Sequence, residues 1–307
     1  MRVTFLGTSG AVPTTERNPS AVFVNRDGDK LLFDCAEGTQ RQMMRFGTGF
    51  GVDHVFVTHT HGDHVLGLPG LLQTWDFNER ERPVAIHAPA GTRGTIEDLV
   101  SVTGDTPSYP VRITQVSAGD TVLDGDGYEV RAIRTEHRCA SVGYAVVEDD
   151  RKGRFDREKA EAELGIPPGP KYSKLHRGEA IEHEGRTIQP EAVVGPDRPG
   201  RTMVYTGDTR PVDAVIDAAA DADLLIHDAT FAQDWADRAR QTAHSTGKEA
   251  ADVATEAGAK RLALTHISTR YGGNPTPILD DARDAFDGEV FVAEDGQRID
   301  VPFPDEE

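Results

Sequence analysis

The sequence contains little cysteine and no long apolar run. Cys35 and Cys139 are the only cysteines among 307 residues. Two cysteines cannot build a disulfide framework, which favours a reducing compartment. No stretch of 18 apolar residues occurs, and the opening "MRVTFLGTSG" has no apolar signal core. We therefore predict no membrane segment and a cytoplasmic location.

Lysine is scarce as well. Only 7 of the 33 basic residues are lysine, and 52 acidic residues give a formal net charge of -19. An acidic, lysine-poor surface suits a salt-rich cytoplasm, so we take a halophilic source as a hypothesis. Taken over the whole chain, this charge argues against a polyanionic partner, unless basic residues gather locally.

Short β-rich runs alternate with helical patterns along most of the chain. Examples of the runs are "RVTFLG", "HVFVTH", "TMVYTGD" and "RLALTHI", and helical spacing occurs at 65–77, 92–101, 211–220, 246–257 and 277–286. This alternation predicts an α/β fold with two sheets and helices on their outer faces. We expect a single domain over 1–307. The Gly-, Pro- and charge-rich segment at about 149–200 breaks the pattern and predicts an inserted arm.

The stretch "THTHGDH" carries the clearest chemical signal. His59 follows an apolar strand directly, and His61 points to the same side because side chains alternate along an extended segment. Gly62 permits a turn, after which Asp63 and His64 lie where a helix begins. Imidazole and carboxylate groups in this arrangement predict a zinc site, with manganese as the second possibility.

Three further polar residues follow apolar strands in the same way, namely His137, Asp208 and His266. In layered α/β folds, ligands bind outside the carboxyl ends of strands. Four strand ends thus offer seven candidate ligands on one rim. Two metal ions sharing a carboxylate need about that many.

Beyond these residues, the sequence resembles the metallo-β-lactamase superfamily and, within it, ribonuclease Z, the tRNA 3′-processing endoribonuclease. The resemblance rests on motifs spread over nearly the whole chain, in order: "FLGTSGAVPTTERN", "LLFDCAEGTQRQM", "HVFVTHTHGDHVLGLPGLL", "GIPPGPKY", "VYTGDTRP", "HDATF", "AHST" and "LTHISTRY". It implies a four-layer αββα sandwich, two zinc ions per chain, precursor tRNA as substrate, and a homodimer. It also implies that the arm is an exosite that grips tRNA.

The resemblance also implies roles for individual residues. It assigns His59, His61 and His137 to one metal and Asp63, His64 and His266 to the other, with Asp208 as the bridge. Asp63 would accept the proton of the attacking water. His244, oriented by Asp228, would protonate the leaving 3′-oxygen. Two positions depart from the family pattern: Asp228 replaces a glutamate, and Thr15 replaces a lysine in a loop linked to handling of the CCA end.

The same resemblance points to RNA contacts. The arm tip offers Lys171 and Lys174 for phosphates, Tyr172 for stacking, and Gly169 for close approach to a backbone, and Arg17 belongs to the loop that borders the cleavage site. Residues 151–186 contain nine bases and seven acids, a net charge of +2, so the other 271 residues carry -21. A solvated charged arm without any partner would have a similar composition.

Two other function classes compete with this interpretation. A small-molecule hydrolase of the same superfamily, such as a cyclic-nucleotide phosphodiesterase or a lactonase, would not need a tRNA-gripping arm. A non-catalytic RNA-binding module on the same scaffold would have lost metal ligands, whereas all seven are present here.

Overall fold

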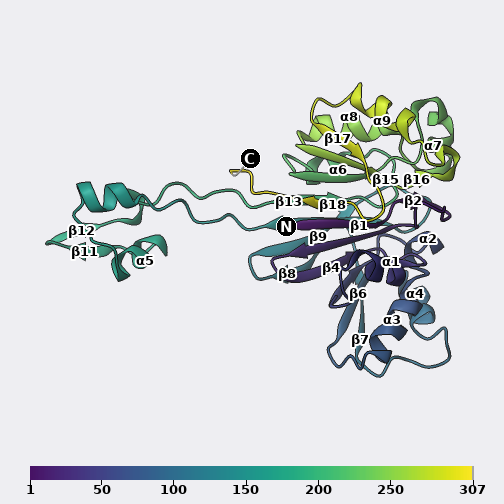
Figure 1. Ribbon diagram of the computed structural model, residues 1–307, viewed down its shortest axis with the longest axis horizontal. Coiled ribbons are helices and arrows are strands. Elements are labelled where there is room, and N and C mark those ends of the chain that lie inside the picture. The colour runs from purple at the N-terminus through teal and green to yellow at the C-terminus, as the bar shows by residue number, and fades with distance from the viewer. Residues whose placement is uncertain (306–307) are drawn as a thin grey trace. The chain divides into compact units, whose positions relative to one another are not determined.

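The computed structural model describes residues 1–305, and its main body contains two seven-stranded sheets (Figure 1). The first sheet has the order β18-β1-β3-β4-β5-β6-β7. Its strands are β18 (Arg298–Asp300), β1 (Arg2–Gly7), β3 (Ala21–Arg26), β4 (Asp29–Phe33), β5 (His54–Phe56), β6 (Val84–Pro89) and β7 (Val111–Val116).

The second sheet has the order β17-β15-β14-β13-β10-β9-β8. Its strands are β17 (Glu289–Val292), β15 (Arg261–Thr265), β14 (Leu224–Asp228), β13 (Thr202–Tyr205), β10 (Val142–Glu148), β9 (Tyr128–Arg134) and β8 (Thr121–Gly125). A short parallel pair, β2 (Ser9–Gly10) with β16 (Ile267–Ser268), joins the N-terminal loop to the segment after β15.

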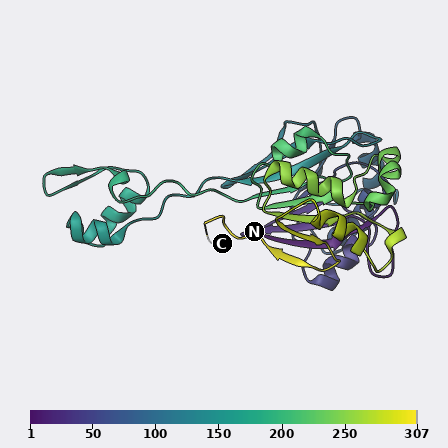
Figure 2. The same ribbon diagram turned by 90° about the horizontal axis from the view of Figure 1, so that it is seen from above.

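The two sheets enclose a central apolar core, and helices pack on their outer faces through two further apolar clusters (Figures 1 and 2). The helices against the first sheet are α1 (Thr39–Phe46), α2 (Gly62–Val65), α3 (Leu68–Phe77) and α4 (Arg93–Val100). Those on the second-sheet side are α6 (Asp213–Ala218), α7 (Ala236–Thr242), α8 (Gly247–Ala257) and α9 (Thr276–Arg283). The central core includes Phe5, Phe33 and Tyr144, all fully buried. This arrangement confirms the predicted four-layer αββα sandwich.

Parallel pairing brings the carboxyl ends of the functional strands to one edge in each sheet. In the first sheet β4, β5, β6 and β7 run parallel. In the second, β13, β14, β15 and β17 do the same. Side chains that follow β5, β13, β14 and β15 therefore leave their sheets at corresponding ends, which is where ligand sites form in such folds.

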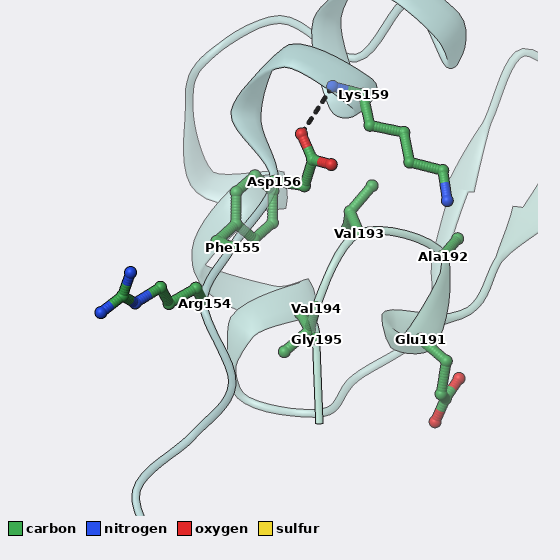
Figure 3. A pocket seen from close by; sticks show the side chains of 9 residues that line it. All are labelled: Arg154, Phe155, Asp156, Lys159, Glu191, Ala192, Val193, Val194 and Gly195. Atoms are coloured by element: carbon green, nitrogen blue, oxygen red, sulfur yellow. Dashed lines mark hydrogen bonds between the residues drawn. The ribbon is translucent and has the colours of Figure 1, made fainter. Parts of the chain in front are cut away.

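The arm forms a second compact unit, made of Glu148–Gly200 together with the C-terminal residues from Phe303. It contains a π-helical turn (Lys159–Glu163), α5 (Pro170–His176), the hairpin β11 (Ile181–His183) and β12 (Arg186–Ile188), and a 3-10 turn (Pro190–Ala192). A small core of its own includes Ile166, Leu175 and Val193. This unit has a hollow of ≈ 420 Å³. Figure 3 shows the side chains that line it, basic and acidic ones among them, including Lys159 and Glu191.

Among the helices of residues 1–305, we find none with the length and apolar character needed to cross a bilayer.

Candidate metal centre

The "THTHGDH" segment leaves β5 and turns directly into helix α2. His61 is the N-cap residue, with extended backbone angles (φ -65°, ψ 151°), and Asp63 and His64 lie in the first turn of the helix. The strand-turn-helix geometry expected from the sequence is therefore present. It places four ligand-type side chains within one short stretch of chain.

Three imidazoles converge on one point. The Nε2 atom of His59 lies 3.0 Å from Nδ1 of His61, and Nε2 of His137 lies 3.2 Å from the same atom. The side chains of His59 and His137 are fully buried, and His61 is partly buried. Ring nitrogens crowded in this way need a shared cation or proton between them. This set, which we call the first ligand set, is spaced for one metal ion.

A second group of ligand atoms gathers beside the first. The Nε2 atom of His266 lies 3.2 Å from Oδ2 of Asp63, and Nε2 of His64 lies 3.7 Å from that same oxygen. Asp63, His64 and His266, which we call the second ligand set, come from α2 and from the residue after β15. Two segments more than 200 residues apart in the chain therefore share one site.

Asp208 stands between the two sets. Its Oδ2 atom lies 3.5 Å from His59, whereas Oδ1 lies 3.3 Å from His64 and 3.2 Å from His266. Oδ1 and the Nε2 atom of His64 are both buried without a hydrogen-bond partner. Buried polar atoms of this kind are costly unless something satisfies them. The residues present thus fit a centre in which one carboxylate faces two metal positions.

The outer nitrogens of these histidines are held by hydrogen bonds. Nδ1 of His64 donates to the buried carboxylate of Asp34 at 2.7 Å, and the Tyr205 hydroxyl donates to that carboxylate at 2.8 Å. Nδ1 of His137 donates to the carbonyl of Ala243 at 2.9 Å. Because these bonds fix the tautomer, the inner Nε2 atoms are left free to bind a metal ion.

His266 is held in an unusual conformation. Its φ is 61°, in the left-handed region, and Nδ1 donates to the Thr230 hydroxyl at 2.8 Å. Gly10 passes so close that a Cβ there would lie 2.7 Å from the His266 ring. Strain of this kind persists where the surroundings impose it, often at functional sites. Gly10, the second glycine of "GTSGA", thus leaves room for the ring of His266, a candidate metal ligand.

His244 lies at the edge of the centre, between α7 and α8. Its Nδ1 donates to Asp228 Oδ2 at 2.8 Å, and Asp228 is fully buried at the end of β14. Burial alone would lower the pKa of His244, but the carboxylates of Asp228 and Asp208 outweigh it and raise the pKa to about 9. A histidine paired with a carboxylate in this way is suited to hold a proton for donation.

Arg210 holds the loop that carries His244. One guanidinium nitrogen donates to the backbone carbonyl of His244, and the same group forms a paired salt bridge with Glu249. Glu249 in turn closes a capping box with Thr246 at the start of α8. These contacts fix the backbone of "AHST".

Asp63 remains ionised in this setting. Burial would raise its pKa, but the hydrogen bond and charge of His266, together with His64, lower it overall. Its Oδ2 also accepts a hydrogen bond from the backbone N–H of Ala11 at 2.8 Å. A carboxylate held in this way has the charge state needed to accept a proton.

Two residues of the centre were not predicted from the sequence. Cys139 places its Sγ within 4.8 Å of ligand atoms of the first ligand set. Asp34, which orients His64, follows β4 in "LLFDC". The sequence feature that could have identified Asp34 is a carboxylate directly after an apolar strand. Cys139 lies two residues after His137, and its position depends on how the loop folds.

The residues predicted to contact RNA differ in how accessible their side chains are to a ligand. Arg17 is buried, and its guanidinium donates to the Thr8 hydroxyl and to the carbonyl of Ala293, inside the fold. In the arm, Lys171 donates to the carbonyl of Glu182, and the Tyr172 hydroxyl donates to the carbonyl of Ile166.

Two of the predicted arm contacts remain open. Lys174 and Gly169 are exposed at the arm tip. The polar groups of Arg17, Lys171 and Tyr172 are therefore engaged in hydrogen bonds within the protein. Lys174 and Gly169 remain accessible to a ligand.

The sandwich fold and this ligand cluster define a member of the metallo-β-lactamase superfamily. A model described as "Beta-lactamase superfamily domain" matches residues 177–267, and one described as "Anti-Pycsar protein Apyc1" matches residues 1–106. Ribonuclease Z of Haloarcula marismortui is 74% identical over 305 residues, covering 99% of this chain and 98% of the relative. Ribonuclease Z of Methanosarcina acetivorans is 50% identical, with 99% of each chain covered.

A solved structure agrees. The short form of human tRNase Z is 30% identical, with a TM-score of 0.71, and the match covers 99% of this chain and 100% of that one. The chain therefore belongs to the ribonuclease Z family. The relative from Haloarcula marismortui also agrees with the halophilic source predicted from the charge.

Proposed function

We propose that this chain is a zinc-dependent endoribonuclease that removes 3′ trailers from precursor tRNA and leaves a 3′-hydroxyl on the tRNA. The observation that carries the proposal is the position of Asp208 between two ligand sets, with the His244–Asp228 pair beside them. Curated relatives named ribonuclease Z support it, and they do not favour the alternative of a small-molecule phosphodiesterase. The direct test is cleavage of a 3′-extended precursor tRNA.

The first ligand set with Asp208 Oδ2 and the second with Asp208 Oδ1 would each hold one metal ion. Imidazole-rich sets favour zinc, and the carboxylates also allow manganese. Bound there, two ions would supply an acidified water and electrostatic stabilisation of the phosphoryl transition state. Asp63 would take the proton of the attacking water, and Asp34 and Thr230 would keep the ligand rings aligned.

His244 would donate the proton that the leaving 3′-oxygen needs. We expect His244→Ala to slow cleavage of RNA by about 10²–10⁴-fold, which is the usual contribution of a general acid. The loss should be much smaller on bis(4-nitrophenyl) phosphate, because nitrophenolate departs without a proton. Steady-state kinetics on both substrates measure the difference. Equal losses would instead assign His244 a structural or binding role.

The arm would supply affinity for tRNA and no chemistry, since none of the seven candidate ligands lies in it. Arg151 and Arg198 pair through backbone hydrogen bonds of 2.7 Å, so a short Gly/Ser linker can join these positions. We expect deletion of 152–197 to raise the KM for precursor tRNA by at least about tenfold, because phosphate contacts dominate nucleic-acid affinity.

Metal content and hydrolysis of bis(4-nitrophenyl) phosphate provide the controls for the arm deletion, and both should persist. Unchanged tRNA kinetics with lost activity on the small substrate would identify the arm as a lid over the site.

A homodimer would form through the exposed apolar surface of α1 and α3. Met44 is 68% exposed and Phe77 is 87% exposed, and they line a cavity of ≈ 580 Å³ with Phe50. Contiguous apolar surface of this kind marks protein–protein contacts. We expect light scattering to give a dimer mass for the wild type and a monomer mass for Phe77→Asp. Val102→Asp, which alters an exposed apolar residue elsewhere, should stay dimeric. A monomeric wild type would exclude the dimer.

A further inference from the structure

A cavity of ≈ 230 Å³ opens beside the metal centre, and two of its wall residues belong to that centre. His244 and His266 line its inner side, and Arg138, Phe231 and Arg238 are among the residues that line the rest. Hydroxyl groups of Thr242, Ser268 and Thr269 complete much of the wall. The cavity is thus continuous with the place where the reaction would occur. It combines cationic, hydroxyl and aromatic groups, as nucleotide sites do.

Arg138 and Arg238 are exposed cations without a partner. Within residues 1–305, neither guanidinium group forms a hydrogen bond or an ion pair. Arg240, two positions after Arg238, is by contrast paired with Asp237. In a chain of net charge -19, two unpaired guanidinium groups in one cavity are an unusual local excess of positive charge. Guanidinium groups match phosphate oxygens in geometry and in charge.

Arg138 also acts electrostatically on the proposed proton donor. The pKa of His244 is lowered by burial, raised by Asp228 and Asp208, and lowered again by the charge of Arg138. Arg138 and His244 also line the same cavity. An anion bound by Arg138 would be a near neighbour of the group that His244 protonates.

The chemistry of the reaction indicates whether the nucleotide in this cavity lies upstream or downstream of the cleaved bond. Cleavage that leaves a 3′-hydroxyl on tRNA releases the 3′-oxygen of the nucleotide upstream of the cut. A proton donor must reach that oxygen by a hydrogen bond. The nucleotide that occupies a cavity lined by His244 is therefore the upstream one, and its own 5′-side phosphate lies farther out, toward the arginines.

We propose that this cavity seats the last nucleotide of the tRNA product, with Arg138 and Arg238 holding the phosphate on its 5′ side. The inference rests on the proposed function and assigns a substrate position to two residues outside the ligand sets. It also explains why a strongly acidic chain keeps two unpaired arginines at this edge. Phosphate contacts of this kind position the chain without reading its sequence.

The test compares two RNAs that differ by one nucleotide. Once the cleavage position has been mapped, the metal-loaded wild-type protein is titrated with the product tRNA and with the same RNA lacking its last nucleotide, both ending in a 3′-hydroxyl, at one fixed salt concentration. We expect the shorter RNA to bind about 10- to 100-fold more weakly. The variant R138Q/R238Q should bind both RNAs equally, because it has lost the contact that the last nucleotide supplies.

The control variant R134Q/R240Q removes two positive charges from exposed arginines outside the cavity. It should discriminate between the two RNAs as the wild type does. R138K/R238K keeps the charges and should recover part of the discrimination. Because the substituted side chains are exposed, circular dichroism and metal content should match the wild type for every variant.

Two results would overturn the inference while leaving the proposed function intact. One is a wild-type protein that cleaves precursor tRNA while R138Q/R238Q still discriminates between the two RNAs. The other is that the isolated 5′-phosphorylated trailer inhibits R138Q/R238Q less strongly than the wild type. That result would place the downstream nucleotide in the cavity. A wild-type protein that cleaves no precursor tRNA would instead overturn the proposed function.

Discussion

Asp63→Ala is expected to abolish cleavage of precursor tRNA while leaving tRNA binding intact. Asp63 Oδ2 lies 3.2 Å from His266 and 3.7 Å from His64, so the carboxylate belongs to the second ligand set as well as to proton transfer. Loss of a general base alone costs about 10²–10⁴-fold, and disturbance of a metal position adds to that loss. Single-turnover cleavage and filter binding measure the two quantities separately.

Asp63→Asn provides the matched control, because it keeps the shape of the side chain and removes its basicity. It should retain more metal than Asp63→Ala and remain nearly as inactive. A rate within a few-fold of the wild type for either variant would show that Asp63 accepts no proton in the reaction.

Asp208→Ala is expected to lower metal occupancy at both positions. One carboxylate oxygen faces His59 at 3.5 Å, and the other faces His64 and His266 at 3.3 and 3.2 Å. Removing a shared ligand therefore weakens two sites at once. Elemental analysis of dialysed protein should give close to two equivalents for the wild type and less than one for the variant.

Asp217→Ala, which alters an exposed carboxylate on α6, should keep the full metal content. One tightly bound metal ion in an active wild-type preparation would contradict the two-metal proposal. Loss of a single equivalent in Asp208→Ala would mean that the carboxylate serves only one ion.

Much of the fold could be predicted from the sequence, because apolar residues recur at characteristic spacings in strands and in amphipathic helices. The helical pattern at 246–257 corresponds to α8 (Gly247–Ala257), whose start is fixed by a capping box. Short or polar elements were missed. The strand β18 (Arg298–Asp300) and helix α7 (Ala236–Thr242) carry too few apolar residues to show a period, and tertiary contacts hold them.

The positions of the candidate metal ligands could be predicted to a similar extent. Ligand-type residues directly after strands can be read from the sequence, since the edge of a parallel sheet collects strand ends. The partners of those residues cannot be read in this way. Asp34 and Arg210 act through hydrogen bonds across 30 or more residues of chain, and Arg138 lines a cavity with residues distant in sequence, so only the folded structure places them.

For Arg17, Lys171 and Tyr172, residue type alone predicted RNA contacts, and the sequence did not reveal the hydrogen bonds that these side chains form within the protein. Their residue types suit RNA, and in the structure their polar groups form hydrogen bonds within the protein. A side chain's chemistry gives its possible partners, and packing decides which partner is nearest. Lys174 is exposed and stays a predicted phosphate contact.

Cleavage of a 3′-extended precursor tRNA tests the central claim most directly. The purified protein, loaded with zinc or manganese, is incubated with precursor tRNA, and both product ends are sequenced. The account predicts one cut at the 3′ end of the tRNA body, a 3′-hydroxyl on the tRNA and a 5′-phosphate on the trailer, with no cut by Asp63→Ala. Intact precursor after incubation with fully metal-loaded protein, or a 3′-phosphate on the tRNA product, would contradict it.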